Sequence, residues 1–227
     1  MPSSRSGAVK RPKVKLAPKL MPAQARSSET YEHLLHVAAQ VLAEVGFEKL
    51  TTNLVCERAK LSPPALYRYF PNKYALLHEL GRRLMEQQNA LIAESLTPDA
   101  FRGTTGQLNE ALTTLLLATF QVTRETTGGI WIMRALRAIP VLQEVRLASA
   151  REVVAQVTAQ LAEAFPGADP EQMKLFSRVA DSMAYAALEM LFDDPTLDPM
   201  AVMQVVAASM ASQVERLASS PKKTSKR

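Results

Sequence analysis

The sequence predicts an all-α fold, and three observations lead to this prediction. Apolar residues recur at the three- and four-residue spacing of amphipathic helices along most of the chain. No segment of real length alternates apolar and polar residues with period two, as a half-buried strand would. The pairs Asp169–Pro170 and Asp198–Pro199 each place an N-cap before a first-turn proline, which is typical of helix starts. We therefore expect about nine helices and no internal repeat.

Local signals set the order of these helices. The first is expected to begin near Ser28 and to end at Gly46, and Thr51 is expected to open the second as its N-cap. The second ends near Lys60, and Ser62 opens the third. Pro98, Gly103 and Gly106 predict a loop. The remaining helices are expected at about 73–95, 107–126, 130–139, 141–165, 170–193 and 199–218.

The charge of the chain is concentrated at its ends. The net charge is +5, but residues 1–27 hold seven basic residues and no acidic ones, and residues 220–227 hold four. The middle keeps 16 of the 27 basic residues and all 22 acidic ones, so it is acidic. Basic charge alone is therefore weak support for DNA binding, because a basic tail attracts any polyanion. We expect residues 1–27 and 219–227 to be disordered.

The third expected helix carries the most distinctive chemistry. Leu66 and Phe70 lie on one stripe, with Pro63 nearby, and are expected to pack inward. The hydroxyl of Ser62 is expected to cap the N–H of Ala65, because Pro64 has none. The other positions are expected to form an exposed face in which an arginine lies between two tyrosines: Pro64, Ala65, Tyr67, Arg68 and Tyr69. Arginine grips guanine bidentately and tyrosine hydroxyls hold phosphates, although the tyrosines would also suit half-buried packing positions.

Residues 28–80 resemble the TetR family of repressors. The resemblance rests on the segments Ala38-Ala39, Gly46-Phe47, Leu50-Thr51-Thr52, Glu57-Arg58-Ala59, Leu66-Tyr67-Arg68-Tyr69-Phe70-Pro71-Asn72-Lys73 and Ala75-Leu76-Leu77. It implies a helix-turn-helix at 28–74 that binds double-stranded DNA. It also implies roles for individual residues: Tyr67, Tyr69 and Lys73 as phosphate clamps, Thr51, Thr52 and Asn53 as contacts from the tip of the second helix, Ala65 and Arg68 as base readers, and Ser62 and Pro64 at the tip of the third.

Two positions depart from the family pattern. The family usually has glycine in the turn, where this chain has Lys60, and a left-handed conformation there costs lysine about 1 kcal/mol. Pro63 replaces a residue that is often polar or small. Direct readout by the first turn is thereby weakened, and the expected specificity shifts to Arg68.

Residues 75–218 are implied to form the effector-binding and dimerisation domain. Two apolar stripes, which ordinary core packing would also explain, are implied to pair in part with a second copy as a four-helix bundle. They consist of Met173, Phe176, Ala180, Met183, Ala184, Ala187 and Leu191, and of Met203, Val206, Met210 and Val214. A small-molecule pocket is expected around Phe120, Trp131, Met133 and Arg134, although these residues would also serve as core fillers beside a solvent-facing arginine.

Other chemistry has little support in the sequence. His33 and His36 lack a third metal ligand nearby, and Cys56 is expected to be a small buried apolar residue. No phosphate loop, nucleophile triad or Cys/His metal spacing occurs, so we expect no enzyme, no metal and no cofactor. No apolar stretch approaches the roughly 18 residues of a membrane span.

The sequence therefore predicts a cytoplasmic, nucleoid-associated homodimeric regulator. It would bind a palindromic operator and release it when a small-molecule effector binds. The alternative is a helical interaction protein whose basic tails dock on an acidic partner or a membrane surface.

Overall fold

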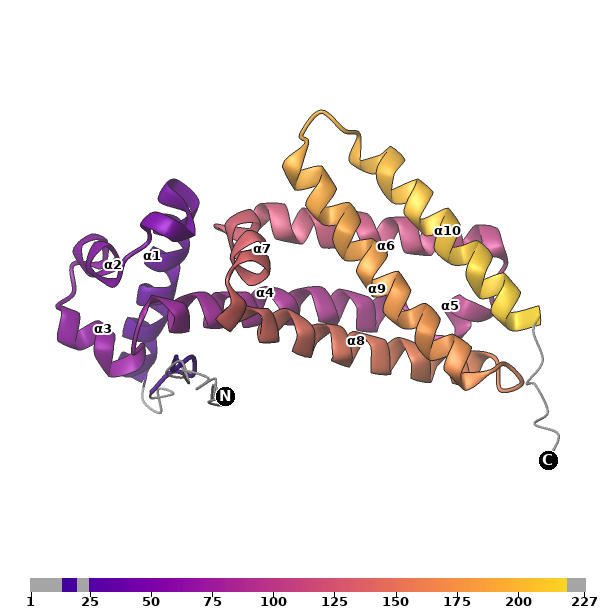
Figure 1. Ribbon diagram of the computed structural model, residues 1–227, viewed down its shortest axis with the longest axis horizontal. Helices are drawn as coiled ribbons and strands as arrows, with labels where there is room; N and C mark the ends of the chain where they lie inside the picture. Colours follow the sequence, from indigo (N-terminus) through magenta and orange to yellow (C-terminus); the bar gives the residue numbers. More distant parts are fainter. Residues whose placement is uncertain (1–13, 20–24, 220–227) are drawn as a thin grey trace, which may run out of the picture.

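The computed structural model describes residues 14–19 and 25–219 of the chain, and these residues form an all-helical protein (Figure 1). The expected all-α class is confirmed. The described residues contain ten α-helices and one 3-10 turn, close to the nine or so helices expected. The disorder expected for residues 1–13, 20–24 and 220–227 lies outside the described residues. No helix in the described ranges is long and apolar enough to cross a membrane.

The N-terminal unit consists of three helices, and a long fourth helix leads out of it. These four helices are, in chain order, α1 (Ala25–Lys49), α2 (Thr52–Ala59), α3 (Pro63–Tyr69) and α4 (Lys73–Ser95). The remaining elements are α5 (Pro98–Arg102), α6 (Thr105–Glu125), α7 (Gly129–Ala138), the 3-10 turn Pro140–Leu142, α8 (Gln143–Ala164), α9 (Pro170–Asp193) and α10 (Pro199–Ser219).

The expected stop at Gly46 is a break within α1. Gly46 has φ 73° and ψ 173°, a conformation that only glycine adopts readily, and the chain then resumes a helical turn to Lys49. The helix also begins three residues earlier than expected, at Ala25. The glycine therefore marks the right place, but the helix that it interrupts is longer than the sequence suggested.

The expected loop around Pro98 and Gly103 is partly wrong, because a short helix, α5, forms there. Thr97 accepts a hydrogen bond from the N–H of Ala100, and Pro98 occupies the first turn. Proline is common in loops and also at the first position of a helix, so Pro98 in the sequence is compatible with either structure. The next helix, α6, then opens with a reciprocal capping box between Thr104 and Gln107.

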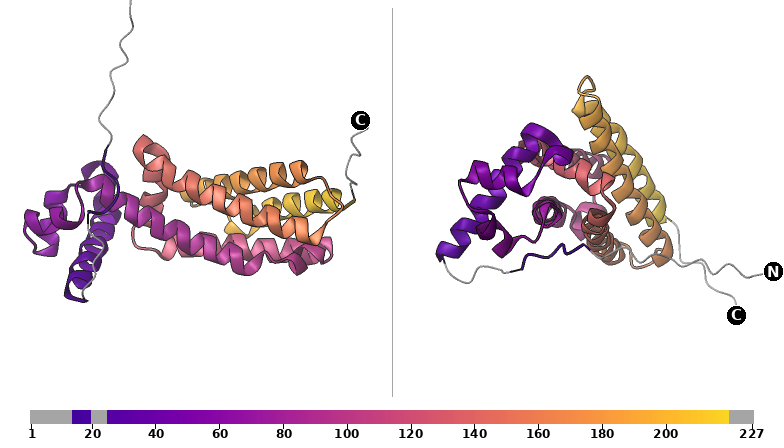
Figure 2. Two further views of the ribbon diagram at one scale, coloured as in Figure 1. Left: turned by 90° about the horizontal axis from the view of Figure 1, so that it is seen from below. Right: turned by 60° about the vertical axis from the view of Figure 1, so that its left-hand side comes forward.

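The long helix α4 forms the axis of the molecule (Figure 1). Its first half lies beside α1 and α7, and further along it packs against α6 and α8. The last two helices, α9 and α10, pack side by side as an outer layer, as the right-hand view of Figure 2 shows. One hydrophobic core runs from α1 to α10. The domain boundary expected after residue 74 therefore falls within the first turn of α4 and is not marked by a gap in the core.

Candidate nucleic-acid interface and ligand cavity

In the turn between α2 and α3, Lys60 adopts the left-handed conformation that is costly for lysine. Lys60 has φ 54° and ψ 38°, the only positive φ at a non-glycine residue in the described ranges. Its N–H donates to the carbonyl of Glu57 (3.2 Å), and the N–H of Leu61 donates to that of Cys56 (3.0 Å). These bonds close the end of α2 and direct the chain into α3.

The start of α3 differs from the expected cap. The Ser62 hydroxyl makes no capping hydrogen bond; instead, its backbone carbonyl accepts from the N–H groups of Ala65 (3.0 Å) and Leu66 (3.3 Å). Pro63 and Pro64 are both exposed, so Pro63 does not extend the buried stripe formed by Leu66 and Phe70. The two rings occupy first-turn positions whose N–H groups have no helical acceptor, which makes the hydroxyl cap dispensable.

The outer face of α3 (Pro64, Ala65, Tyr67 and Arg68) points away from the core. Arg68 is exposed and forms no ion pair with any other described residue. Tyr67 is 39% exposed, and its hydroxyl lies 3.0 Å from the Thr52 hydroxyl at the tip of α2. This contact joins the two short helices. The exposed Arg68 guanidinium, which has no carboxylate partner among the described residues, can meet an anionic or hydrogen-bonding surface.

The Arg68 guanidinium lies 5.9 Å from the centre of the Tyr69 ring, but Tyr69 is buried, so the expectation that it would be exposed beside Arg68 is wrong. The side chain of Tyr69 is only 3% exposed and packs edge-on against Tyr31 of α1, with ring centroids 5.9 Å apart. Its hydroxyl lies 3.2 Å from the hydroxyl of Ser27. The half-buried reading of the tyrosines is therefore correct for Tyr69, whereas Tyr67 has the exposure that a DNA contact needs.

Lys73 and Thr51 both form hydrogen bonds to the ends of neighbouring helices. The Lys73 ammonium donates to the carbonyls of Phe47 (3.2 Å), Glu48 (3.4 Å) and Leu50 (3.2 Å), where α1 ends. The Thr51 hydroxyl caps α2 by accepting from the N–H of Leu54. Because all three ammonium protons have acceptors, a phosphate would compete with the end of α1 for Lys73.

An N-terminal strap (residues 14–19) lies against the end of α3, contrary to the disorder expected for the whole arm. The N–H of Lys19 donates to the Tyr69 carbonyl (2.8 Å), and its ammonium donates to the Tyr67 carbonyl (3.2 Å). The side-chain amide of Asn72 donates to the Lys15 carbonyl (3.0 Å). No apolar period marks this segment in the sequence, so only its hydrogen bonds show that it is placed.

A charged cluster joins α1 to α4 behind the helix-turn-helix. Arg83 donates to both carboxylate oxygens of Glu32 (2.6 and 2.7 Å) and to the buried carboxylate of Glu79 (2.9 Å), which Arg82 also contacts. Burial by itself would raise the pKa of Glu79, but the two guanidinium groups hold it below its usual value. Burial, with the Glu79 charge, raises the pKa of nearby Tyr31 to about 12. The cluster therefore persists in its charged form at neutral pH.

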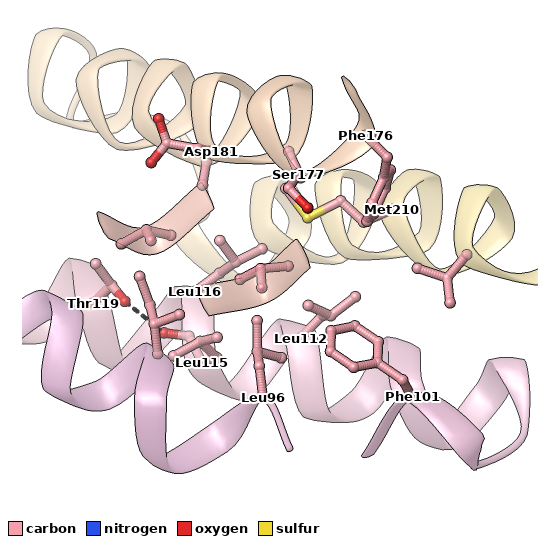
Figure 3. Close-up of a pocket in the computed structure, with 16 residues that line it drawn as sticks. Leu96, Phe101, Leu112, Leu115, Leu116, Thr119, Phe176, Ser177, Asp181 and Met210 are labelled. Atoms are coloured by element: carbon pink, nitrogen blue, oxygen red, sulfur yellow. Dashed lines mark hydrogen bonds between the residues drawn. The ribbon is translucent and has the colours of Figure 1, made fainter. Parts of the chain in front are cut away.

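A cavity of about 90 Å³ lies inside the second domain, between α4, α5, α6, α8, α9 and α10 (Figure 3). Its lining is almost entirely apolar; the polar exceptions are Thr119, Ser177 and Asp181. The hydroxyls of Thr119 and Ser177 already donate to backbone carbonyls of their own helices. In Figure 3 the Asp181 carboxylate points away from the centre of the cavity, and it pairs with Arg146 on α8 (3.4 Å). The lumen therefore suits an apolar group.

Two of the side chains that line the cavity also border a groove on the surface of the protein. Phe176 of α9 and Met210 of α10 also line a groove on the outside of the molecule, between those two helices. Figure 3 shows the two side chains next to each other. They form the wall that separates the inner cavity from the outer groove.

None of the four residues at which the sequence predicted a pocket lines this cavity, and that pocket stays a prediction. Met133 is buried in the core, and Phe120 stacks on Phe192 with ring centroids 5.1 Å apart. Trp131 packs on Phe47 of α1, and Arg134 lies over the Trp131 ring and pairs with Asp193 (3.2 Å). The alternative of core packing is closer to the structure. The lining of this cavity consists mainly of aliphatic residues that look like ordinary core in the sequence, so no signal distinguished them.

Cys56 and His33, which the sequence offers as candidates for a reactive thiol and a metal ligand, both contact neighbouring residues of the N-terminal unit. Cys56 is buried, as expected, and burial raises the pKa of its thiol. His33 directs its Nε2 to the Ala59 carbonyl at 3.2 Å. Within the described residues, no group of three His, Cys, Asp or Glu side chains is arranged to hold a metal ion.

The architecture is that of a helix-turn-helix protein with a separate helical domain, and comparisons with known proteins agree. Residues 34–80 match the family model described as bacterial regulatory proteins, tetR family. The chain is 42% identical over 50 residues to tetracycline repressor protein class G of Vibrio anguillarum (22% of this chain, 24% of that protein). It is 41% identical over 54 residues to the class C protein of Escherichia coli (24% and 25%). The matches thus span about a quarter of the length of these relatives.

The likeness in fold extends further than the likeness in sequence. The crystal structure of NalD, the secondary repressor of the MexAB-OprM multidrug efflux pump in Pseudomonas aeruginosa, superposes with a TM-score of 0.63 at 20% identity. The superposition covers 84% of this chain and 98% of that one. Residues 34–80 are therefore similar in sequence to the TetR family of transcriptional regulators, and the rest of the described chain is similar to such proteins in fold. This similarity does not favour the alternative of a docking protein with basic tails.

Proposed function

We propose that this protein is a sequence-specific, DNA-binding transcriptional repressor that a small apolar effector releases from a palindromic operator. The outer face of α3 carries the proposal. Arg68 is exposed and forms no ion pair with a described residue, and the Tyr67–Thr52 contact sets the position of its neighbour. Such a face can enter the major groove, where arginine reads guanine O6 and N7.

A palindromic operator requires two copies of this face, and α9 and α10 are suited to pair with a second subunit. Several large apolar side chains on these helices remain exposed, among them Leu175 (63%) and Val205 (69%). Apolar side chains on two adjacent helices are typical of the interface of a four-helix bundle. A homodimer formed in this way would present two α3 helices to one duplex, and it would act in the cytoplasm at the nucleoid.

The effector site that we propose is the cavity shown in Figure 3. Its lining suits an uncharged, largely apolar molecule, since the hydroxyls inside it are already satisfied. Both α4 and α6 contribute to its walls, and α4 continues directly to the charged cluster on α1. An occupant that displaces α4 would therefore change the separation of the two α3 helices and favour the DNA-free state.

Selection of bound duplexes from random oligonucleotides tests the proposal, and a palindrome is the expected product. Arg68→Ala should weaken binding to that duplex by about 1–3 kcal/mol and relax preference at one position in each half-site. Arg102→Ala is the matched control, because it removes the same charge from α5, where Arg102 pairs with Asp99. Equal weakening of selected and random DNA by Arg68→Ala would contradict base reading.

A further inference from the structure

The N-terminal strap spans the junction between α3 and α4. At one end Lys19 contributes both its backbone N–H and its ammonium to the last turn of α3. At the other end the Lys15 carbonyl accepts from Asn72, the N-cap residue of α4. Between them, Leu16 packs against the hydrophobic core. The segment is therefore attached to both helices and to the core beneath them.

The end of α3 needs such partners. The last carbonyls of any helix have no acceptor role within the helix itself, and α3 has only seven residues. The carbonyls of Tyr67 and Tyr69 are two of these groups, and Lys19 satisfies both. A cation at a helix C-terminus is also favoured by the direction of the peptide dipoles. Without the strap, both carbonyls would depend on water, and the end of α3 would be freer to fray.

Asn72 links the strap to the connecting helix. Its side-chain oxygen accepts from the N–H of Ala75 (3.0 Å) and so caps α4, while its amide nitrogen donates to Lys15. One side chain thus holds the first turn of α4 and the strap at the same time. A change in the angle between α3 and α4 would have to break or lengthen one of these bonds.

We propose that the strap belongs to the DNA-reading apparatus and that Lys19 is a positioning residue for it. Lys19 holds the Tyr67 carbonyl on one side, while Thr52 holds the Tyr67 hydroxyl on the other. Arg68 follows directly in the chain, so the strap fixes the orientation from which that arginine meets DNA. The consequence for DNA rests on the proposed function; the consequence for α3 itself does not.

Two lysines in the strap provide a matched comparison. Lys15→Ala and Lys19→Ala each remove one positive charge from the same short segment, but only the Lys19 ammonium bonds to α3, since Lys15 uses its backbone carbonyl. If the strap merely adds charge, the two variants will weaken DNA binding alike. If Lys19 positions α3, its loss will reduce binding to the selected palindrome by roughly 3- to 10-fold more than binding to a random duplex of equal length. Lys19→Arg should recover most of that ratio.

Two deletions separate the strap from the chain before it. Removal of residues 1–13 takes away Arg5, Lys10, Arg11 and Lys13 but keeps the strap, and it should lower the salt dependence of binding without changing the specificity ratio. Removal of residues 1–19 should lower the ratio as well. Equal specificity ratios for the two deletions would overturn the proposal.

Hydrogen exchange provides a readout that needs no DNA. The Phe70 amide bonds to the Leu66 carbonyl in the last turn of α3. In the absence of DNA, exchange at this amide should accelerate several-fold in Lys19→Ala and in the 1–19 deletion, but not in Lys15→Ala or the 1–13 deletion. Unchanged exchange in all four variants would refute the positioning role of Lys19 and the strap, even if DNA binding is confirmed. Accelerated exchange in Lys19→Ala and the 1–19 deletion, with no palindrome selected, would instead reject the proposed function.

Discussion

The indole ring of Trp131 lies so close to Gly46 that a Cβ on this glycine would stand 3.2 Å from two ring atoms. Trp131 belongs to α7, and Gly46 is the break in α1 of the N-terminal three-helix unit. The same ring packs edge-on against Phe47. Through this contact α7 packs directly against α1 of the N-terminal unit, in addition to the connection that the continuous helix α4 provides.

Gly46→Ala should destabilise the protein by about 2–3 kcal/mol. The backbone conformation at φ 73° and ψ 173° is unfavourable for any residue with a Cβ, and the Trp131 ring would also have to shift. Thermal and urea unfolding measure the loss. Gly106→Ala is the control, since a Cβ at Gly106 meets nothing within 4 Å, and it should be neutral or slightly stabilising. Similar losses in both variants would contradict this account.

Glu79→Gln should lower the free energy of unfolding by about 1–2 kcal/mol at pH 7, because two guanidinium groups lose a buried partner. The loss stays modest since Arg82 and Arg83 are 40% and 36% exposed and can turn to water. The exposed Glu86, which also pairs with Arg82, provides the control, and Glu86→Gln should cost less than 0.5 kcal/mol, a roughly neutral surface change.

The effect of Glu79 should also depend on pH. Its pKa in the folded protein lies below its usual value of 4.5, so its stabilising contribution is fully present above that pH and is lost as pH falls through the folded pKa. The gap between wild type and Glu79→Gln should therefore narrow below pH 4.5. A gap of constant size from pH 7 to pH 3 would show that the charge of Glu79 is not what stabilises the cluster.

Lys60→Gly should stabilise the protein by about 1 kcal/mol, because glycine adopts the left-handed conformation of this turn without the Cβ penalty. Lys60 is exposed, so little packing is lost. Lys60→Ala removes the same charge but keeps a Cβ, and no gain is expected from it. Chemical unfolding of the three proteins distinguishes the effect of conformation from that of charge; an equal gain in both variants would favour charge.

Ala180→Leu should fill much of the inner cavity and block its occupation. Benzene is a suitable apolar probe, since an apolar cavity of about 150 Å³ binds it, and it should raise the Tm of the wild-type protein. The rise should vanish in Ala180→Leu and persist in Ala159→Leu, a control at an exposed position of α8. Persistence of the rise in both would place the benzene site elsewhere.

Local chemistry made much of the DNA-binding unit predictable. Thr51 caps α2, Lys60 turns left-handed and Gly46 interrupts α1, and each outcome depends on interactions within a few residues. The roles of Tyr67 and Tyr69 were not separable in this way. Both lie near the edge of the apolar stripe of α3, and the position of Tyr31 on another helix decides which of them is buried.

The cavity and the strap could not be predicted for a related reason. The cavity is a gap left where six helices meet, and its aliphatic lining has the same periodicity as filled core. The strap depends on bonds between residues about fifty positions apart, such as Lys19 with Tyr67 and Lys15 with Asn72. Neither distance in sequence nor composition reveals such pairs.

The shared wall formed by Phe176 and Met210 has an evolutionary consequence. A substitution that reshapes the cavity for a different effector also reshapes the outer groove between α9 and α10, where we place the subunit interface. A substitution at either of these two positions that changes the effector would therefore also alter which copies of the protein can associate. Duplicated genes that diverge here would acquire a new ligand and cease to form mixed dimers in the same step.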